Sequence, residues 1–295
     1  MKLRAITGGA YIATLLVFYL LKIFVHDLCF DALIYAFALI GTFEITRAFK
    51  EKLTKAETAL VFCFAGACIP LTSFAESYGY GLPIAGTCFA LFALGLLALF
   101  VFQYDATTPE NAGLTLLSAV YPTVLLVLLV LANHIAVTET MVRYAFNSAL
   151  AMVLIFVISP SADILAYLFG RFLRGKFPKK MAEKISPNKT LIGGIGGIVG
   201  GLVGAVAVYF CYNAICGSFE NMAIWLPVYA LIGVFGALAT EFGDLVESAI
   251  KRKVGIKDMG KLLPGHGGIL DRIDGTLFAT IPVYFVFALV YILTL

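Results

Sequence analysis

Charged residues are scarce in this 295-residue chain. Asp, Glu, Lys and Arg together make up 13% of it, whereas 61% of the residues are hydrophobic and the mean hydropathy is +0.97. A soluble protein needs far more polar surface, so this composition indicates a polytopic membrane protein. The apolar runs also lack the alternation of period two that a membrane β-barrel needs. Because the backbone in a bilayer must satisfy its own hydrogen bonds, we predict an all-α fold.

Several sequence signals are absent. The first apolar run has no A-x-A-like cleavage site, so we expect a retained helix rather than a removed signal peptide. The six cysteines lie in or beside apolar runs, and the CxxxxC spacing of Cys63/Cys68 and Cys211/Cys216 is not a usual zinc pattern. We therefore expect neither a zinc site nor a disulfide framework. The GxxxxGK[ST] order of a phosphate-binding P-loop is missing as well.

Nine apolar runs predict nine transmembrane helices, most of them near the ~20 residues that a spanning helix needs. The runs cover residues 8–25, 30–47, 58–75, 82–102, 113–133, 146–169, 191–213, 223–243 and 276–294. All 21 basic residues except Lys22 and Arg143 then fall on one side of the membrane. Basic residues favour the cytoplasmic side, so we place the charged connections there and the C-terminus outside. The fourth connection is predicted to share that side although it has no basic residue, and its Thr107–Pro109 segment indicates a helix start.

The polar residues concentrate in one stretch, residues 241–276. No Gly or Pro interrupts residues 244–254, which predicts a helix, and its spacing puts Asp244, Ser248 and Lys251 on one face together with Glu241. Residues 257–268 contain four glycines and one proline, which predicts an ordered loop.

Carboxylates on both sides of this loop predict a metal site. Asp244 precedes the loop, and Asp271 and Asp274 follow it at the start of the last apolar run. Mg²⁺ binds one or two carboxylates and completes its shell with substrate phosphates and water, while nearby cations hold the other phosphate oxygens. A helix from Trp225 to Asp244 rises about 30 Å, a hydrocarbon thickness, so we expect Asp244 near the headgroups.

Two further segments are predicted to serve the same site. In the sixth apolar run, Asp163, Tyr167, Gly170 and Arg171 share one helix face, and a carboxylate within a span usually faces a polar cavity or a partner. Residues 186–194 open the seventh run, where a helix start favours phosphate or ribose contact. The glycines that follow are spaced four apart, which favours close helix packing from Gly200 onward.

The residues from Ser248 to Asp274 resemble the signature of phosphatidate cytidylyltransferases (CDP-diacylglycerol synthases). They read SAIKRKVGIKDMGKLLPGHGGILDRID, without departure at any fixed position of the signature. Three shorter motifs typical of that family are present too: GDLxES at 243–248, DxxAYxxGR at 163–171 and SPxKTxxG at 186–193. The resemblance covers residues 160–275, and residues 1–145 carry no motif.

The resemblance implies a reaction in which CTP and phosphatidate give CDP-diacylglycerol and pyrophosphate, by attack of the lipid phosphate on the α-phosphorus of CTP. It implies Mg²⁺, with room for a second ion of unknown identity. We assign catalysis to Asp244, Asp271, Lys251 and Arg272, and metal binding to Asp244, Asp271, Asp274, Glu247 and Asp163. We assign substrate binding to Ser186, Asn188, Lys189, Thr190, Ser248, Arg252, Lys257 and His266.

The predicted organisation is an all-α polytopic membrane protein of about nine spans, with a cytoplasm-facing active site between helices. Residues 1–145 are expected to form a scaffold and a dimer surface, and residues 146–295 a catalytic domain with the signature at 248–274. We expect CTP, phosphatidic acid, membrane lipids and a second copy of the chain as partners, no nucleic acid, and a bacterial inner membrane as the location.

Two alternatives stay open at this point. A CTP-dependent polyprenol or phytol kinase belongs to a family that resembles this one distantly, although the full signature disfavours it. An ion-coupled transporter would use Asp163 and Asp244 as an ion path, but transporter carboxylates lie near the membrane midplane rather than at one side.

Overall fold

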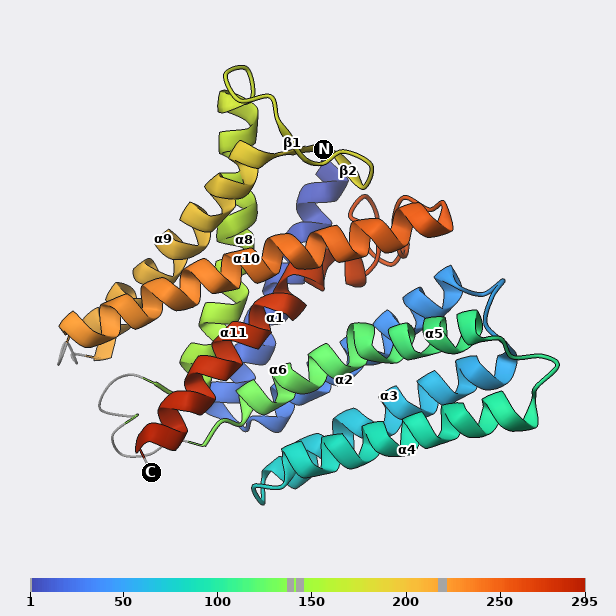
Figure 1. Ribbon diagram of the computed structural model, residues 1–295. Coiled ribbons are helices and arrows are strands. Elements are labelled where there is room, and N and C mark those ends of the chain that lie inside the picture. The colour runs from blue at the N-terminus through green and yellow to red at the C-terminus, as the bar shows by residue number, and fades with distance from the viewer. Residues whose placement is uncertain (1, 137–140, 142–145, 217–221, 295) are drawn as a thin grey trace. The chain divides into compact units, whose positions relative to one another are not determined.

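Helices dominate the computed structural model, which describes residues 2–136, 141, 146–216 and 222–294 (Figure 1). Its elements are α1 (Lys2–Phe24), α2 (Leu28–Ala48), α3 (Lys55–Glu76), α4 (Gly81–Phe102), α5 (Pro109–Ser118), the π-helical turn η1 (Ala119–Val124), α6 (Leu125–Asn133), α8 (Ser148–Leu173), β1 (Lys180–Ala182), β2 (Ser186–Thr190), α9 (Leu191–Cys216), α10 (Met222–Val254) and α11 (Leu270–Thr294). Within the described residues nine helices are long and apolar enough to cross a membrane. The predicted all-α, polytopic membrane fold is confirmed.

Helix boundaries follow local capping signals. Thr108 caps α5, because its Oγ1 accepts a hydrogen bond from Asn111 N at 3.2 Å and Pro109 takes the first helical position. This confirms the helix start predicted at Thr107–Pro109. Together α5, η1 and α6 make one candidate span, Pro109–Asn133.

The chain divides into two compact units. The first comprises Met1–His134 and Lys253–Arg272, and the second comprises Ile135–Arg252 and Ile273–Leu295. The loop between α10 and α11 thus packs with the N-terminal helices. The predicted division into a scaffold of residues 1–145 and a catalytic domain of residues 146–295 concerns roles, and it stays a prediction.

In the first unit α3 and α4 lie side by side (Figure 1). Buried polar contacts join α2, α3 and α6. The Asp31 carboxylate is 4% exposed, accepts a hydrogen bond from Asn133 Nδ2 at 2.8 Å, and lies 2.5 Å from His134 Nε2. Ser73 Oγ donates to the same carboxylate. A buried carboxylate is tolerated because these groups replace its lost hydration.

The second unit packs α9 closely against its neighbours through glycines. A Cβ atom on Gly200 would lie 2.3 Å from the Ser161 carbonyl oxygen of α8, and one on Gly201 would lie 2.5 Å from the Gly233 carbonyl oxygen of α10. The predicted packing role of the glycines from Gly200 onward is confirmed. At the other end of this unit the buried Phe146 ring contacts Tyr229 and Phe287 at centroid distances of 5.3 and 4.8 Å.

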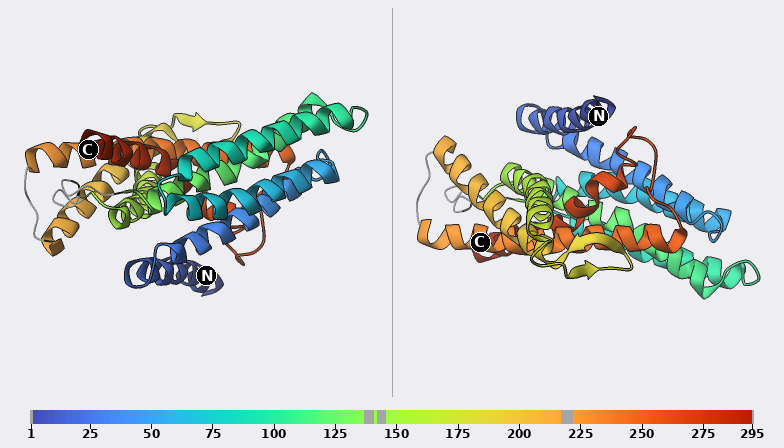
Figure 2. Two further views of the ribbon diagram at one scale, coloured as in Figure 1. Left: turned by 90° about the horizontal axis from the view of Figure 1, so that it is seen from below. Right: turned by 90° about the horizontal axis from the view of Figure 1, so that it is seen from above.

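A short antiparallel β-hairpin joins α8 to α9 and is visible as yellow arrows in both views of Figure 2. It pairs Lys180 with Thr190 and Ala182 with Ser186. The hairpin matters for the site because β2 consists of the predicted substrate-binding segment, Ser186–Thr190.

Candidate active site

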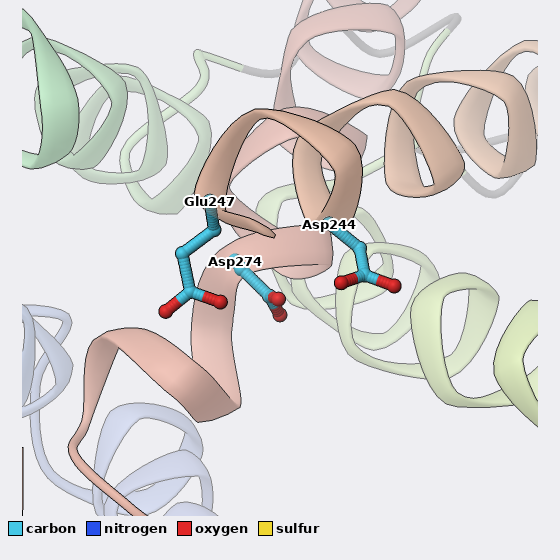
Figure 3. Close-up of side chains that lie close together, drawn as sticks. All are labelled: Asp244, Glu247 and Asp274. Atoms are coloured by element: carbon cyan, nitrogen blue, oxygen red, sulfur yellow. The ribbon is translucent and has the colours of Figure 1, made fainter. Parts of the chain in front are cut away.

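Three carboxylates from two helices form one cluster in the second unit. Asp244 and Glu247 lie three residues apart on α10 and therefore share a face, and Asp274 comes from α11. One carboxylate oxygen from each lies within 4.8 Å of those of the others. Figure 3 shows Asp274 between Asp244 and Glu247. Of the predicted metal ligands, the structure brings these three together.

A glycine lets the two helices approach at this point. A Cβ atom on Gly243 would lie 2.5 Å from the Phe278 ring and 2.8 Å from the Asp274 carbonyl oxygen. Only glycine leaves room for this contact of α10 with α11. The residue that follows Gly243 in the GDLxES motif, Asp244, is thereby held beside Asp274.

Two lysines pair with carboxylates of this region. Lys189, at the end of β2, lies 2.9 Å from Glu241 Oε2 and 2.5 Å from Asp244 Oδ2. Lys251 lies 2.7 Å from Glu247 Oε2, and the Glu247 side chain is fully buried. Burial alone would lower the pKa of Lys189, but the Asp244 and Glu241 carboxylates outweigh it and raise that pKa above its usual value. Lys189 is therefore a cation at neutral pH.

Neighbouring groups orient the cluster and the hairpin. Ser248 Oγ donates to Asp244 Oδ1 at 3.3 Å, and Asp274 Oδ1 accepts from Gly275 N at 2.8 Å. The predicted substrate ligand Arg252 is exposed, and its Nε donates to the Ile185 carbonyl oxygen in the hairpin turn at 3.3 Å.

A cavity of about 600 Å³ lies between α8, the hairpin, α9 and α10. Its lining residues are Asp163, Ala166, Tyr167, Gly170, Arg171, Arg174, Asn188, Lys189, Thr190, Gly193, Gly194 and Glu241. The four α8 residues predicted to share one face all line this cavity. Its cations are suited to phosphate groups, because guanidinium and ammonium groups form charge-assisted hydrogen bonds to phosphate oxygens.

Residues 186–190 lie in a strand that leads directly into α9. Thr190 Oγ1 accepts a hydrogen bond from Gly193 N at 3.1 Å, which caps the first turn of the helix. Thr190 is 5% exposed and its hydroxyl serves the helix start, and it lines the cavity together with Asn188 and Lys189.

The charges of the cluster fit a divalent cation. Asp244, Glu247 and Asp274 offer oxygen ligands, which hard ions such as Mg²⁺ prefer. Asp163 and Glu241 are further carboxylates nearby. Lys189 and Lys251 form ion pairs with Glu241, Asp244 and Glu247, whereas among the described residues no basic nitrogen lies within 4.0 Å of the Asp163 or Asp274 carboxylate. An added cation would offset negative charge in the cluster.

Other predicted site residues belong to the first unit, in or next to the loop between α10 and α11. Asp271 is 7% exposed, and its Oδ2 accepts hydrogen bonds from Met259 N and Gly268 N, each at 2.8 Å. His266 Nδ1 lies 2.7 Å from the Thr7 hydroxyl. Lys257 and Arg272 are exposed. The predicted roles of Asp271 in metal binding and catalysis, of Arg272 in catalysis, and of Lys257 and His266 in substrate binding stay predictions.

Glu44, near the end of α2, contacts this loop but was not among the residues predicted for the site. It is 3% exposed, and its oxygens accept hydrogen bonds from Ile269 N and Leu270 N. The sequence did contain a signal for Glu44, because it is a carboxylate inside an apolar run. Such groups are costly in membranes and usually have a partner. The sequence did not show which partner.

Comparisons with known proteins agree with the motifs. Residues 2–290 match the cytidylyltransferase family. A phosphatidate cytidylyltransferase of Bacillus subtilis (strain 168) is 34% identical over 296 residues, which cover 98% of each chain. Proteins of the same name from Brucella abortus biovar 1 (strain 9-941) and Staphylococcus haemolyticus (strain JCSC1435) are 42% and 44% identical over 134 and 125 residues. These alignments cover 45% of each chain for the Brucella protein, and 42% of this chain and 43% of the Staphylococcus protein.

The match extends over nearly the whole chain, so the resemblance first noted in residues 160–275 is confirmed and widened. It does not favour the lipid kinase or the transporter. The chain belongs to the cytidylyltransferase family, and its enzyme class is nucleotidyltransferase.

Proposed function

We propose that this protein is a CTP:phosphatidate cytidylyltransferase, which forms CDP-diacylglycerol and pyrophosphate. A phosphate oxygen of phosphatidate forms a bond to the α-phosphorus of CTP. The bond from that phosphorus to the bridging oxygen breaks, and pyrophosphate leaves with the electron pair. The observation that carries the proposal is the Asp244–Glu247–Asp274 cluster, in a family member whose neighbouring cavity is lined with cations.

The chain's part in this reaction is to bind and align two polyanions. A phosphate monoester has its second pKa near 6, so the lipid phosphate is mostly dianionic at neutral pH and needs little help from a base. Arg171, Arg174 and Lys189 line the cavity and are suited to hold phosphate oxygens. Asn188 is the neighbouring polar group for ribose or phosphate.

We propose that Asp244, Glu247 and Asp274 hold a Mg²⁺ ion, with Asp163 as a nearby supporting carboxylate. When bound, the ion would neutralise negative charge that develops on the leaving pyrophosphate. Ser248 keeps Asp244 oriented through its hydrogen bond, and Lys251 keeps Glu247 oriented through its ion pair. Asp271, whose Oδ2 binds loop amides, stays a further predicted ligand, and a second ion is likewise a prediction.

An assay of purified protein in detergent tests the proposed reaction. Labelled CTP and phosphatidate should give CDP-diacylglycerol and pyrophosphate in equal amounts, whereas ATP in place of CTP should give little product. Polyprenol in place of phosphatidate should give no phosphorylated lipid. Efficient turnover with ATP, or a phosphorylated polyprenol as the main product, would contradict the proposal.

We further propose that the α8–α9 hairpin and the α10–α11 loop face the cytoplasm of a bacterial cell, with the protein in the inner membrane. The basis is the one-sided distribution of Lys and Arg. In a variant without native cysteines, a cysteine at Lys180 should react with an impermeant label only from the cytoplasmic side. One at Tyr78, an exposed residue between α3 and α4, should react only from outside. Labelling of both from one side would refute this orientation. Glu220, which the sequence also predicts outside, lies beyond the described residues.

A homodimer is also part of the proposal. Light scattering of the detergent-solubilised protein measures its mass and so tests for the homodimer. A mass of one chain at all concentrations would exclude the homodimer.

A further inference from the structure

Glu44 binds the start of α11 with both carboxylate oxygens. Its Oε1 accepts a hydrogen bond from Ile269 N at 3.0 Å, and its Oε2 accepts one from Leu270 N at 2.9 Å. The partners are more than 220 residues apart in sequence, and all three residues belong to the first unit. A residue of α2 therefore caps a helix whose first turns carry Asp271 and Asp274.

The chemistry of this contact favours a fixed position. The first backbone N–H groups of a helix have no partner within the helix, and the helix N-terminus attracts negative charge. Glu44 is buried, and among the described residues no Lys, Arg or His nitrogen lies within 4.0 Å of its oxygens. The helix start thus offsets part of the cost of burying the carboxylate, and the carboxylate satisfies two N–H groups of the helix start.

Glycines of the signature leave the space that Glu44 occupies. A Cβ atom on Gly260 would lie 2.1 Å from Glu44 Oε1, and one on Gly268 would lie 2.2 Å from it. From the other side Asp271 Oδ2 binds Met259 N and Gly268 N. Asp271 therefore fastens both ends of the segment from residue 259 to residue 268, and Glu44 fastens the two residues that follow it, Ile269 and Leu270.

We infer that Glu44 is a positioning residue for the reaction, although it lies far outside the signature and touches no reacting group. By fixing the loop and the start of α11, it sets where the predicted substrate ligands Lys257 and His266 and the predicted metal ligand Asp271 lie. The expected effect of Glu44 on turnover rests on the proposed function. The expectation that Glu44 fixes the loop rests only on the hydrogen bonds.

The test compares Glu44→Gln with Glu57→Gln. Glu57 is also a buried carboxylate of the first unit, and it caps α3 by accepting a hydrogen bond from Thr54 N at 2.8 Å, but that helix carries no signature residue. Backbone hydrogen exchange in peptides covering residues 257–270 should become about 10- to 100-fold faster in Glu44→Gln. This is the size of effect expected when a hydrogen bond loses its charged acceptor. Glu57→Gln should leave this exchange unchanged. The kcat of Glu44→Gln should fall at least about tenfold, because small displacements of positioned groups are costly to turnover.

The outcomes separate the two claims. Unchanged exchange and turnover in Glu44→Gln, or an equal loss of kcat in both variants, would overturn the positioning role. If the wild-type protein shows no CTP-dependent turnover, the proposed function fails, and the exchange comparison still decides whether Glu44 fastens the loop. If Glu44→Gln does not fold, Gly260→Ala disturbs the same contact from the loop side and should produce the same faster exchange. Unchanged exchange there would also overturn the inference.

Discussion

Replacing Asp244 by Asn should reduce turnover by about 10³-fold or more while the protein stays folded. The change keeps the size of the side chain and its ability to accept from Ser248, but it removes one of three clustered charges. A single electrostatic group at a reacting centre is worth about 10²- to 10³-fold, and a lost ion leaves more charge uncompensated. Activity across a Mg²⁺ titration, on protein that elutes as a single species in detergent, measures the effect.

Two controls accompany this prediction. Asp105→Asn makes the same chemical change at an exposed position between α4 and α5 and should leave activity unchanged. Asp274→Asn should resemble Asp244→Asn, and the double variant should be little worse than either, because residues that act through one ion are not additive. Near-normal turnover of Asp244→Asn at ordinary Mg²⁺ would refute its ligand role.

Replacing Gly200 by Ala should destabilise the second unit by about 2 kcal/mol or more, within the usual cost of overpacking. The added Cβ would lie 2.3 Å from the Ser161 carbonyl oxygen and 3.0 Å from the Ala162 Cα. Both are backbone atoms that no side-chain rotation can move. Since α8 and α9 would have to separate, the neighbouring contact of Gly204 with Ser161 would loosen as well.

The matched control is Gly66→Ala on α3, where a Cβ would meet nothing within 4 Å. There Ala should be neutral or stabilising by up to about 1 kcal/mol, because glycine is the poorer helix former. Thermal unfolding followed in detergent should show a lower apparent Tm for Gly200→Ala, by about 4 °C or more. If both variants unfolded at the wild-type temperature, the close packing of α8 on α9 would be refuted.

Hydropathy predicted the fold well because a bilayer allows few alternatives. Each of the nine apolar runs corresponds to a candidate span, and the helix predicted for residues 244–254 continues α10 to Val254 without a break. The glycine spacing predicted the packing of α9, since small residues four apart necessarily form one stripe on a helix. The hairpin Lys180–Thr190 was not predicted, because SPNKT has no alternation of apolar residues to indicate a strand.

The site was predicted only in part, for a physical reason. Helix spacing in the sequence placed Asp244 on one face with Glu241, Ser248 and Lys251, but it could not show that Asp274 lies beside Asp244 and Glu247. That contact depends on the approach of α10 to α11 at Gly243, a tertiary feature. Glu44 escaped prediction for the same reason, because its partners are backbone N–H groups more than 220 residues away, which leave no side-chain pattern in the sequence.

Divalent-ion binding tests the central claim most directly, because it does not require substrate. Mn²⁺ bound to the purified protein can be followed by electron paramagnetic resonance as the signal of free Mn²⁺ decreases. Wild-type protein and Asp105→Asn should bind Mn²⁺ equally, whereas Asp244→Asn and Asp274→Asn should each weaken binding by about tenfold or more, since each removes a charged ligand of a hard cation. Binding by both cluster variants at the wild-type affinity would contradict the assignment of Asp244, Glu247 and Asp274 as the metal site.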